Sequence, residues 1–124
     1  LMDTHAEALA AVPQAHVEFL KELSLSYTHE DLFFCHAGVR PEVPLDQQSL
    51  EDLIWIRKGF HEYTASHPKM IVHGHTIVEK ATHYGNHINL DTGAGKFKPL
   101  TTAVFEGSKA WTLTDTGRKE LTPV

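Results

Sequence analysis

The sequence predicts a fold of the α+β class, in which helices flank a β-sheet. Two segments, after Pro13 and after Ser49, carry apolar residues at helical spacing. Three apolar-rich runs, at 32–35, 70–72 and 87–90, are too short for helices and are typical of buried strands. With 124 residues, of which 41% are hydrophobic, the chain is the size of one domain and can bury a core.

Both predicted helices have recognisable starts. The first covers 13–23 and opens with Pro13, which suits a first helical turn. The second begins at Ser49, a favoured N-cap residue, and continues to Ile56. Because its apolar side chains must pack inward, we expect Trp55 to lie in the core. Further along, two β-rich runs at 100–105 and 110–113 surround Gly107 and predict a β-hairpin.

The overall charge argues against a role in binding nucleic acid or anionic membranes. The formal net charge is -5, and the Lys and Arg residues do not form a cluster that could contact a phosphate backbone. No stretch is long and apolar enough to span a bilayer or to act as a secretory signal. Cys35 is the single cysteine and cannot form an intrachain disulfide, so we expect a reducing, cytoplasmic compartment.

The most informative feature is that each of the three strand-like runs ends in a potential ligand followed closely by glycine. The strings are Cys35-His36-Ala37-Gly38, Val72-His73-Gly74-His75 and Leu90-Asp91-Thr92-Gly93. Where strands share a sheet, their carboxyl ends lie together, so these side chains can converge on one crevice. Imidazoles and carboxylates suit Mn, Fe, Zn or Co rather than Ca or Mg. The sequence therefore predicts a metal site at this edge.

Several assignments within these strings stay open on spacing alone. His73 and His75 lie two positions apart, and Gly74 interrupts the strand geometry between them, so either could be the ligand. Asp91 could cap a turn, orient an imidazole or bind the metal directly. Cys35 is expected to be a core thiol. Outside the strings, Arg57 presents a planar group that either binds phosphate oxygens or is simply a surface cation.

These stretches resemble the bacterial serine/threonine protein phosphatases of the calcineurin-like metallophosphoesterase superfamily. Together they cover most of the chain in the family's order; the matching segments are 13–23, 33–41, 52–57, 71–76 and 88–94. The resemblance implies a pair of mixed β-sheets flanked by helices, of which residues 1–124 would be a single partial domain, the C-terminal half. It also implies that His36 and His75, rather than His73, bind a pair of divalent metal ions, with Mn favoured, and that Arg57 binds the substrate phosphate.

The sequence departs from the family pattern in one large respect. The family's Gly-Asp-x-His-Gly, Gly-Asp-x-x-Asp-Arg-Gly and Gly-Asn-His-Glu motifs, which supply most other ligands, do not occur. Two histidines cannot hold two metals, so we expect the isolated chain to have little or no phosphatase activity. The exposed side of such a half would favour self-association or a complementary N-terminal segment.

Two other functions stay open. A relative that hydrolyses dinucleoside polyphosphates would share the same motifs and differ mainly in what lines the cleft, so the substrate is expected to be either a phosphorylated protein or a nucleotide. A non-catalytic module that keeps the fold for metal binding or protein interaction is a candidate of another class; Arg57 beside both histidines favours an enzyme.

Overall fold

The computed structural model describes residues 2–124, with side chains from residue 4 onward. It contains a five-stranded sheet with the order β1-β2-β3-β5-β4. The strands are β1 (Ser26–His29), β2 (Leu32–Cys35), β3 (Met70–His73), β4 (Thr82–His83) and β5 (His87–Asn89). The central strands β2, β3 and β5 are parallel, whereas β1 and β4 pair antiparallel at the edges. The mixed α+β architecture predicted from the sequence is confirmed.

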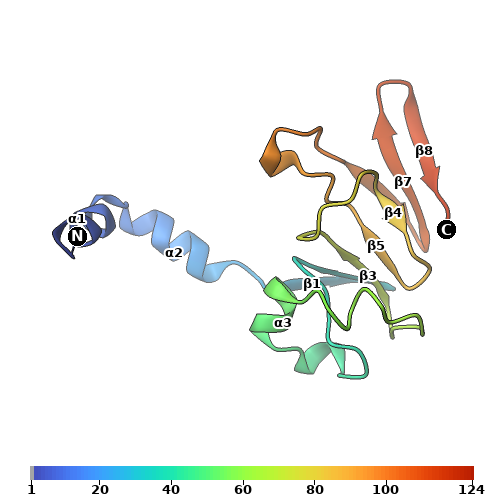
Figure 1. Ribbon diagram of the computed structural model, residues 1–124, viewed down its shortest axis with the longest axis horizontal. Helices are drawn as coiled ribbons and strands as arrows, with labels where there is room; N and C mark the ends of the chain where they lie inside the picture. The colour runs from blue at the N-terminus through green and yellow to red at the C-terminus, as the bar shows by residue number, and fades with distance from the viewer. Residues whose placement is uncertain (1) are drawn as a thin grey trace.

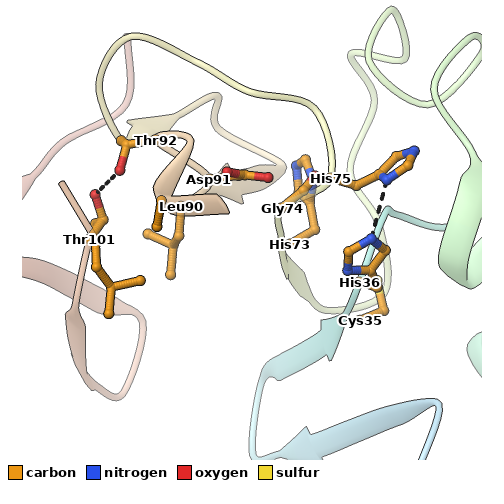
Figure 2. A pocket seen from close by; sticks show the side chains of 11 residues that line it. Cys35, His36, His73, Gly74, His75, Leu90, Asp91, Thr92 and Thr101 are labelled. Carbon is orange, nitrogen blue, oxygen red and sulfur yellow. Dashed lines mark hydrogen bonds between the residues drawn. The ribbon is translucent and has the colours of Figure 1, made fainter. Parts of the chain in front are cut away.

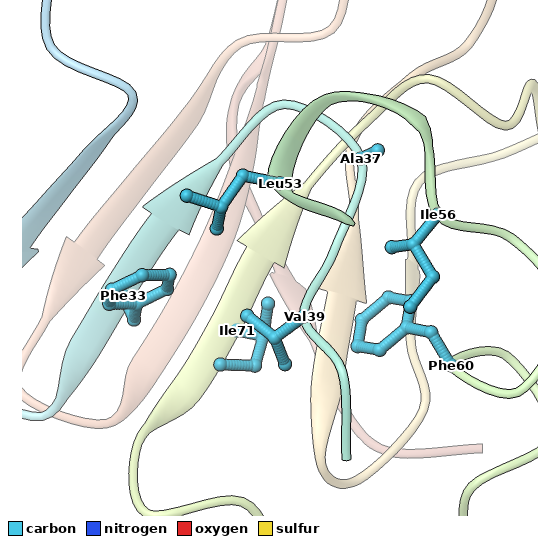
Figure 3. Packing of buried hydrophobic residues seen from close by; sticks show 7 residues of the cluster. All are labelled: Phe33, Ala37, Val39, Leu53, Ile56, Phe60 and Ile71. Atoms are coloured by element: carbon cyan, nitrogen blue, oxygen red, sulfur yellow. The ribbon is translucent and has the colours of Figure 1, made fainter. Parts of the chain in front are cut away.

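One face of this sheet packs against the segment between β2 and β3, and this packing forms the hydrophobic core (Figure 3). Phe33 of β2 and Ile71 of β3 contribute from the sheet, and Phe60, which is 0% exposed, contributes from the covering segment. The other members of the cluster are Ala37, Val39, Leu53 and Ile56. The runs that contain Phe33 and Ile71 are continuously apolar because the strands that carry them lie inside the sheet.

The covering segment contains α3 (Leu50–Trp55), which begins where the sequence predicts. Ser49 is the N-cap: its Oγ accepts a hydrogen bond from the Asp52 backbone N–H at 3.1 Å. Leu53 faces the core, but Trp55 is 65% exposed, so its expected core position is wrong. In a helix of only six residues the inward face is narrow, and Leu53 and the following Ile56 occupy it.

A second, three-stranded antiparallel sheet has the order β6-β7-β8. Its strands are β6 (Ala103–Glu106), β7 (Lys109–Thr114) and β8 (Gly117–Leu121), so the predicted hairpin is confirmed and a further strand is added. Short 3-10 helices lie at Leu45–Gln47 and Ala94–Lys96. Phe34 of β2 meets Phe105 of β6 edge-to-face at 5.7 Å, which brings the two sheets into contact.

Helices α1 (Met2–Ala11) and α2 (Gln14–Glu22) extend away from the sheets, as Figure 1 shows. The predicted helix over 13–23 is therefore confirmed as α2, with Pro13 as its N-cap. Its apolar side is not covered, because Phe19 and Leu20 are each 63% exposed. Among the described helices, none combines the length and the apolar character needed to cross a membrane.

Candidate metal centre

The parallel pairing of β2, β3 and β5 places their carboxyl ends at one edge of the sheet. His36 follows β2, His75 lies just beyond β3 and Asp91 just beyond β5, and all three line one open pocket of about 310 Å³ (Figure 2). Backbone hydrogen bonds continue past the strands and hold these ends together: Gly74 N–H donates to His36 O, and Leu90 N–H donates to His73 O, each at 2.9 Å. The structure thus gathers the three predicted strand ends in one pocket.

His36 and His75 form the central pair of this pocket. Their Nε2 and Nδ1 atoms lie 3.2 Å apart, and the dashed line in Figure 2 marks this contact. His75 has a φ of 66°, which is uncommon for a residue with a side chain. Its Nε2 is buried and has no hydrogen-bond partner among the described residues. A buried imidazole nitrogen without a partner is free to bind a ligand.

Burial and nearby charges favour the neutral form of His75. Burial, the positive charge of Arg57 and the neighbouring His36 lower the pKa of His75, in that order of size. A neutral imidazole is the form that binds a metal ion. His36 Nε2 and His75 Nδ1 lie next to each other, and His75 Nε2 has no hydrogen-bond partner among the described residues. This arrangement fits part of a divalent-metal site.

Arg57 and Trp55 stand at the C-terminal end of α3, beside His75. The Trp55 ring meets the His75 ring edge-to-face at 5.5 Å. Arg57 is exposed and forms no ion pair within the described part of the chain, whereas Arg40 is bound to Asp52 through Nε–H and Oδ2 at 3.0 Å. Arg57 is thus an uncompensated cation close enough to His75 to affect its pKa.

Asp91 has a turn-capping role in the structure. Its Oδ1 accepts a hydrogen bond from Gly93 N–H at 2.9 Å. The backbone of Gly74 passes so close that a Cβ at this position would lie 3.2 Å from the Asp91 Cβ. Glycine at 74 therefore permits the close approach of the β3 and β5 ends. Of the three possibilities for Asp91, the structure shows the turn cap.

His73 differs from His75 although both border the pocket. The His73 ring is buried, and its Nε2 lies 2.8 Å from Nδ1 of His87. Burial, the largest cause, lowers the pKa of His73 to about 4 and that of His87 to about 3. Cys35, at the pocket floor, packs against the core as expected, and burial raises its pKa to about 12.

A second group of histidines includes His73 of this pocket. Among residues 4–124, one group of three possible metal ligands is present, formed by His61, His73 and His87. One ligand nitrogen of each ring lies within 4.8 Å of the other two. These three could hold a metal ion. No sequence pattern selects His61 or His87, because their spacing has no meaning until β3 and β5 are paired. In that pairing His73 lies opposite Asn89, two residues beyond His87, so both histidines face the same side.

Comparison with known proteins supports the fold. A scan against protein-family models and a search of curated proteins each found no match. A search of solved structures found a crystal structure described as "a putative diadenosine tetraphosphatase", with a TM-score of 0.62 and 15% sequence identity. The match covers 96% of this chain and 60% of that chain. At this identity the similarity concerns the fold, so the chain has the fold of a large portion of that structure.

Proposed function

We propose that the His36–His75 pocket is part of the active site of a metal-dependent phosphoester hydrolase, with a serine/threonine protein phosphatase as the first candidate. The observation that carries this proposal is the meeting of His36 and His75 at 3.2 Å, at the ends of adjacent parallel strands. Arg57, an unpaired cation near enough to His75 to lower its pKa, supplies the type of group that binds phosphate oxygens.

His36 and His75 would each hold a divalent ion, with Mn²⁺ favoured. When bound, such ions supply positive charge to the phosphate oxygens and lower the pKa of a bound water molecule. His36, His75 and Arg57 would position the ions and the substrate. The two imidazoles, kept in place by rigid strand ends, fix the position of the ions, and Arg57 orients the phosphate so that the attacking oxygen can approach in line.

The two imidazoles are too few for a complete two-metal site, so further ligands are needed. The chain spans 60% of the length of the solved structure that it matches. We therefore assign the activity to the complete protein and expect residues 1–124 alone to be inactive. Robust metal-dependent hydrolysis of p-nitrophenyl phosphate by the isolated chain would contradict this expectation.

A dinucleoside polyphosphate hydrolase is the second candidate. The exposed Trp55 ring beside His75 offers an aromatic surface on which a nucleotide base could stack, and the matched structure is described as "a putative diadenosine tetraphosphatase". A non-catalytic binding module, the third candidate, would have no need of an unpaired Arg57 near His75.

The deciding experiment compares hydrolysis of a phosphoserine peptide and of diadenosine tetraphosphate by the complete protein with Mn²⁺. A His36→Ala variant should lose at least about a hundredfold in kcat/KM with the preferred substrate, whereas a His29→Ala variant, changed at an exposed strand residue, should keep full activity. No turnover of either substrate by the wild-type protein would favour the non-catalytic module. Equal activity of the two variants would exclude His36 from the site.

A further inference from the structure

We propose that His61, His73 and His87 form a second metal site, adjoining the His36–His75 pocket that His73 also lines, for a borderline divalent transition-metal ion such as Zn²⁺. One ligand nitrogen from each of the three rings lies within 4.8 Å of the others. Nitrogen ligands about 2.1 Å from a tetrahedral zinc ion lie roughly 3.4 Å from each other. Small side-chain movements would therefore bring the three nitrogens to the spacing of a zinc site.

The ring orientations support ligation by His73 Nε2 and His87 Nδ1. These atoms face each other at 2.8 Å, and the opposite nitrogen of His73, Nδ1, lies 3.1 Å from the Gly74 carbonyl oxygen. A proton on Nδ1 can be donated to this carbonyl, which leaves the Nε2 lone pair facing His87 Nδ1. Metal-binding histidines typically donate their second ring N–H to a backbone carbonyl in this way.

The rings around the group hold it in place. Phe60 contacts all three imidazoles, with ring centroids 5.3 Å from His61, 4.9 Å from His73 and 4.8 Å from His87. Tyr84 also supports the group, because its ring stacks on the His87 ring at a centroid distance of 4.6 Å. Because the supporting rings restrict the imidazole rotamers, the ligand atoms are preorganised, and binding an ion requires little reordering.

The donor set also indicates which ions would bind. All three donors are imidazole nitrogens, and no carboxylate belongs to the group as the described residues form it. Three imidazoles suit Zn²⁺, Co²⁺, Ni²⁺ or Cu²⁺, whereas Mg²⁺ and Ca²⁺ require oxygen ligands. A three-histidine zinc site normally keeps a fourth position for water or another ligand. The hydroxyl oxygen of Thr76 lies 3.1 Å from His61 Nε2, so a polar group adjoins the His61 ring.

The site would connect the segment after α3 to the sheet. His73 and His87 belong to β3 and β5, whereas His61 lies in the irregular segment after α3 and is half-buried, which gives an ion a route to the site. The backbone N–H of His61 donates a hydrogen bond to the Arg57 carbonyl oxygen at 3.2 Å. An ion held by His61 would therefore restrain the turn that carries Arg57.

Cobalt titration of the chain tests this proposal. Co²⁺ in a tetrahedral nitrogen site gives intense visible absorption, which a hydrogen-bonded histidine cluster cannot produce. The titration is made in a His36→Ala, His75→Gly background, so that the first pocket does not contribute; glycine suits the φ of 66° at position 75. We expect one Co²⁺ per chain, with the tetrahedral spectrum, and release of the ion by excess Zn²⁺.

Adding His61→Ala should weaken Co²⁺ binding at least about tenfold and remove the tetrahedral spectrum. His67→Ala is the matched control: His67 is also half-buried and packs on Phe60 at 5.7 Å, but it does not belong to the three-nitrogen group. Circular dichroism of both variants confirms that they are folded. If His61 were too important for folding, Co²⁺-dependent perturbation of the His87 ring resonances in the background variant would replace this comparison.

Two results would overturn the proposal. One is a background variant that binds no Co²⁺, which would leave the His36–His75 pocket as the metal site and the proposed function intact. The other is identical binding by the His61→Ala and His67→Ala variants. Conversely, tetrahedral Co²⁺ binding in the background variant, together with an inactive complete protein, would support the second site and count against the phosphoesterase.

Discussion

His36 and His75 are 39 positions apart in the chain, yet their imidazole nitrogens lie 3.2 Å from each other. The parallel pairing of β2 with β3 creates this contact, and a backbone hydrogen bond from Gly74 N–H to His36 O extends the pairing beyond the strands. Both rings thus lie within two residues of strand ends that the sheet holds together. Such support is what a catalytic site requires, because small displacements of its groups are costly.

Arg57→Ala should impair the complete protein in substrate binding and turnover. Removing a charge-assisted hydrogen bond to phosphate costs about 1.5–3 kcal/mol, or roughly 10- to 100-fold in kcat/KM. Steady-state kinetics with the preferred substrate measure this loss. Arg118→Ala is the control, because Arg118 pairs with Glu106 on the second sheet. Unchanged kinetics for Arg57→Ala would mean that Arg57 is only a surface cation.

Phe60→Ala should destabilise the chain strongly, because the Phe60 ring is fully buried at the centre of the core. Loss of a buried phenylalanine ring costs about 3–5 kcal/mol. Phe97→Ala replaces the same residue type at a fully exposed position and should change stability by less than about 0.5 kcal/mol. Urea denaturation followed by circular dichroism compares the two variants. Similar midpoints would show that the core does not depend on Phe60.

The central strands β2 and β3 were predictable because each is a short apolar run, a pattern that burial in the middle of a sheet favours; β5 (His87–Asn89) has Ile88 between two buried polar residues. The edge strands β1, β4 and β8 were not. Ser26–His29 and Gly117–Leu121 are polar, with mostly exposed side chains, and Thr82–His83 has only two residues. Strands of this kind are stabilised by pairing with a neighbour, which a local sequence pattern does not reveal.

The candidate site, like the fold, was predictable only in part. The strings that contain His36, His75 and Asp91 indicated a shared edge, since the carboxyl ends of parallel strands meet. The roles of Trp55 and His61 depended on tertiary structure. Trp55 has an apolar ring but is exposed beside His75, and His61 joins His73 and His87 only when its segment folds over the sheet.

Acid should destabilise the metal-free chain through His73 and His87. Their folded pKa values, about 4 and about 3, lie below the ordinary value of 6.5, so the unfolded state binds more protons between pH 6.5 and about 3. Stability is therefore full above pH 6.5 and falls as pH decreases, by up to about 1.4 kcal/mol per histidine for each pH unit. The groups that act on these two rings include His61, His67, His83 and Asp91.

Thermal denaturation in EDTA at pH 7, 6, 5 and 4 measures this effect. A His87→Phe variant should show a shallower decline than the wild type, because one of the two groups no longer binds a proton on unfolding. His16→Gln, changed at an exposed position of α2, should follow the wild type. If all three proteins lost stability in parallel, the buried histidines would not be the source of the acid sensitivity.

Helix α2 should mediate self-association of the isolated chain. Its apolar side chains are uncovered, with Phe19 and Leu20 each 63% and Leu23 52% exposed, and Figure 1 shows the helix standing clear of the sheets. Exposed apolar surface of this kind is stabilised by a partner, either a second copy or a complementary segment. Light scattering across a concentration series should therefore give masses above that of the monomer. Phe19→Ser with Leu20→Lys should shift the chain towards monomer, whereas Phe97→Ser, which removes a fully exposed ring elsewhere, should not. A wild-type chain that remains monomeric at high concentration would contradict the prediction.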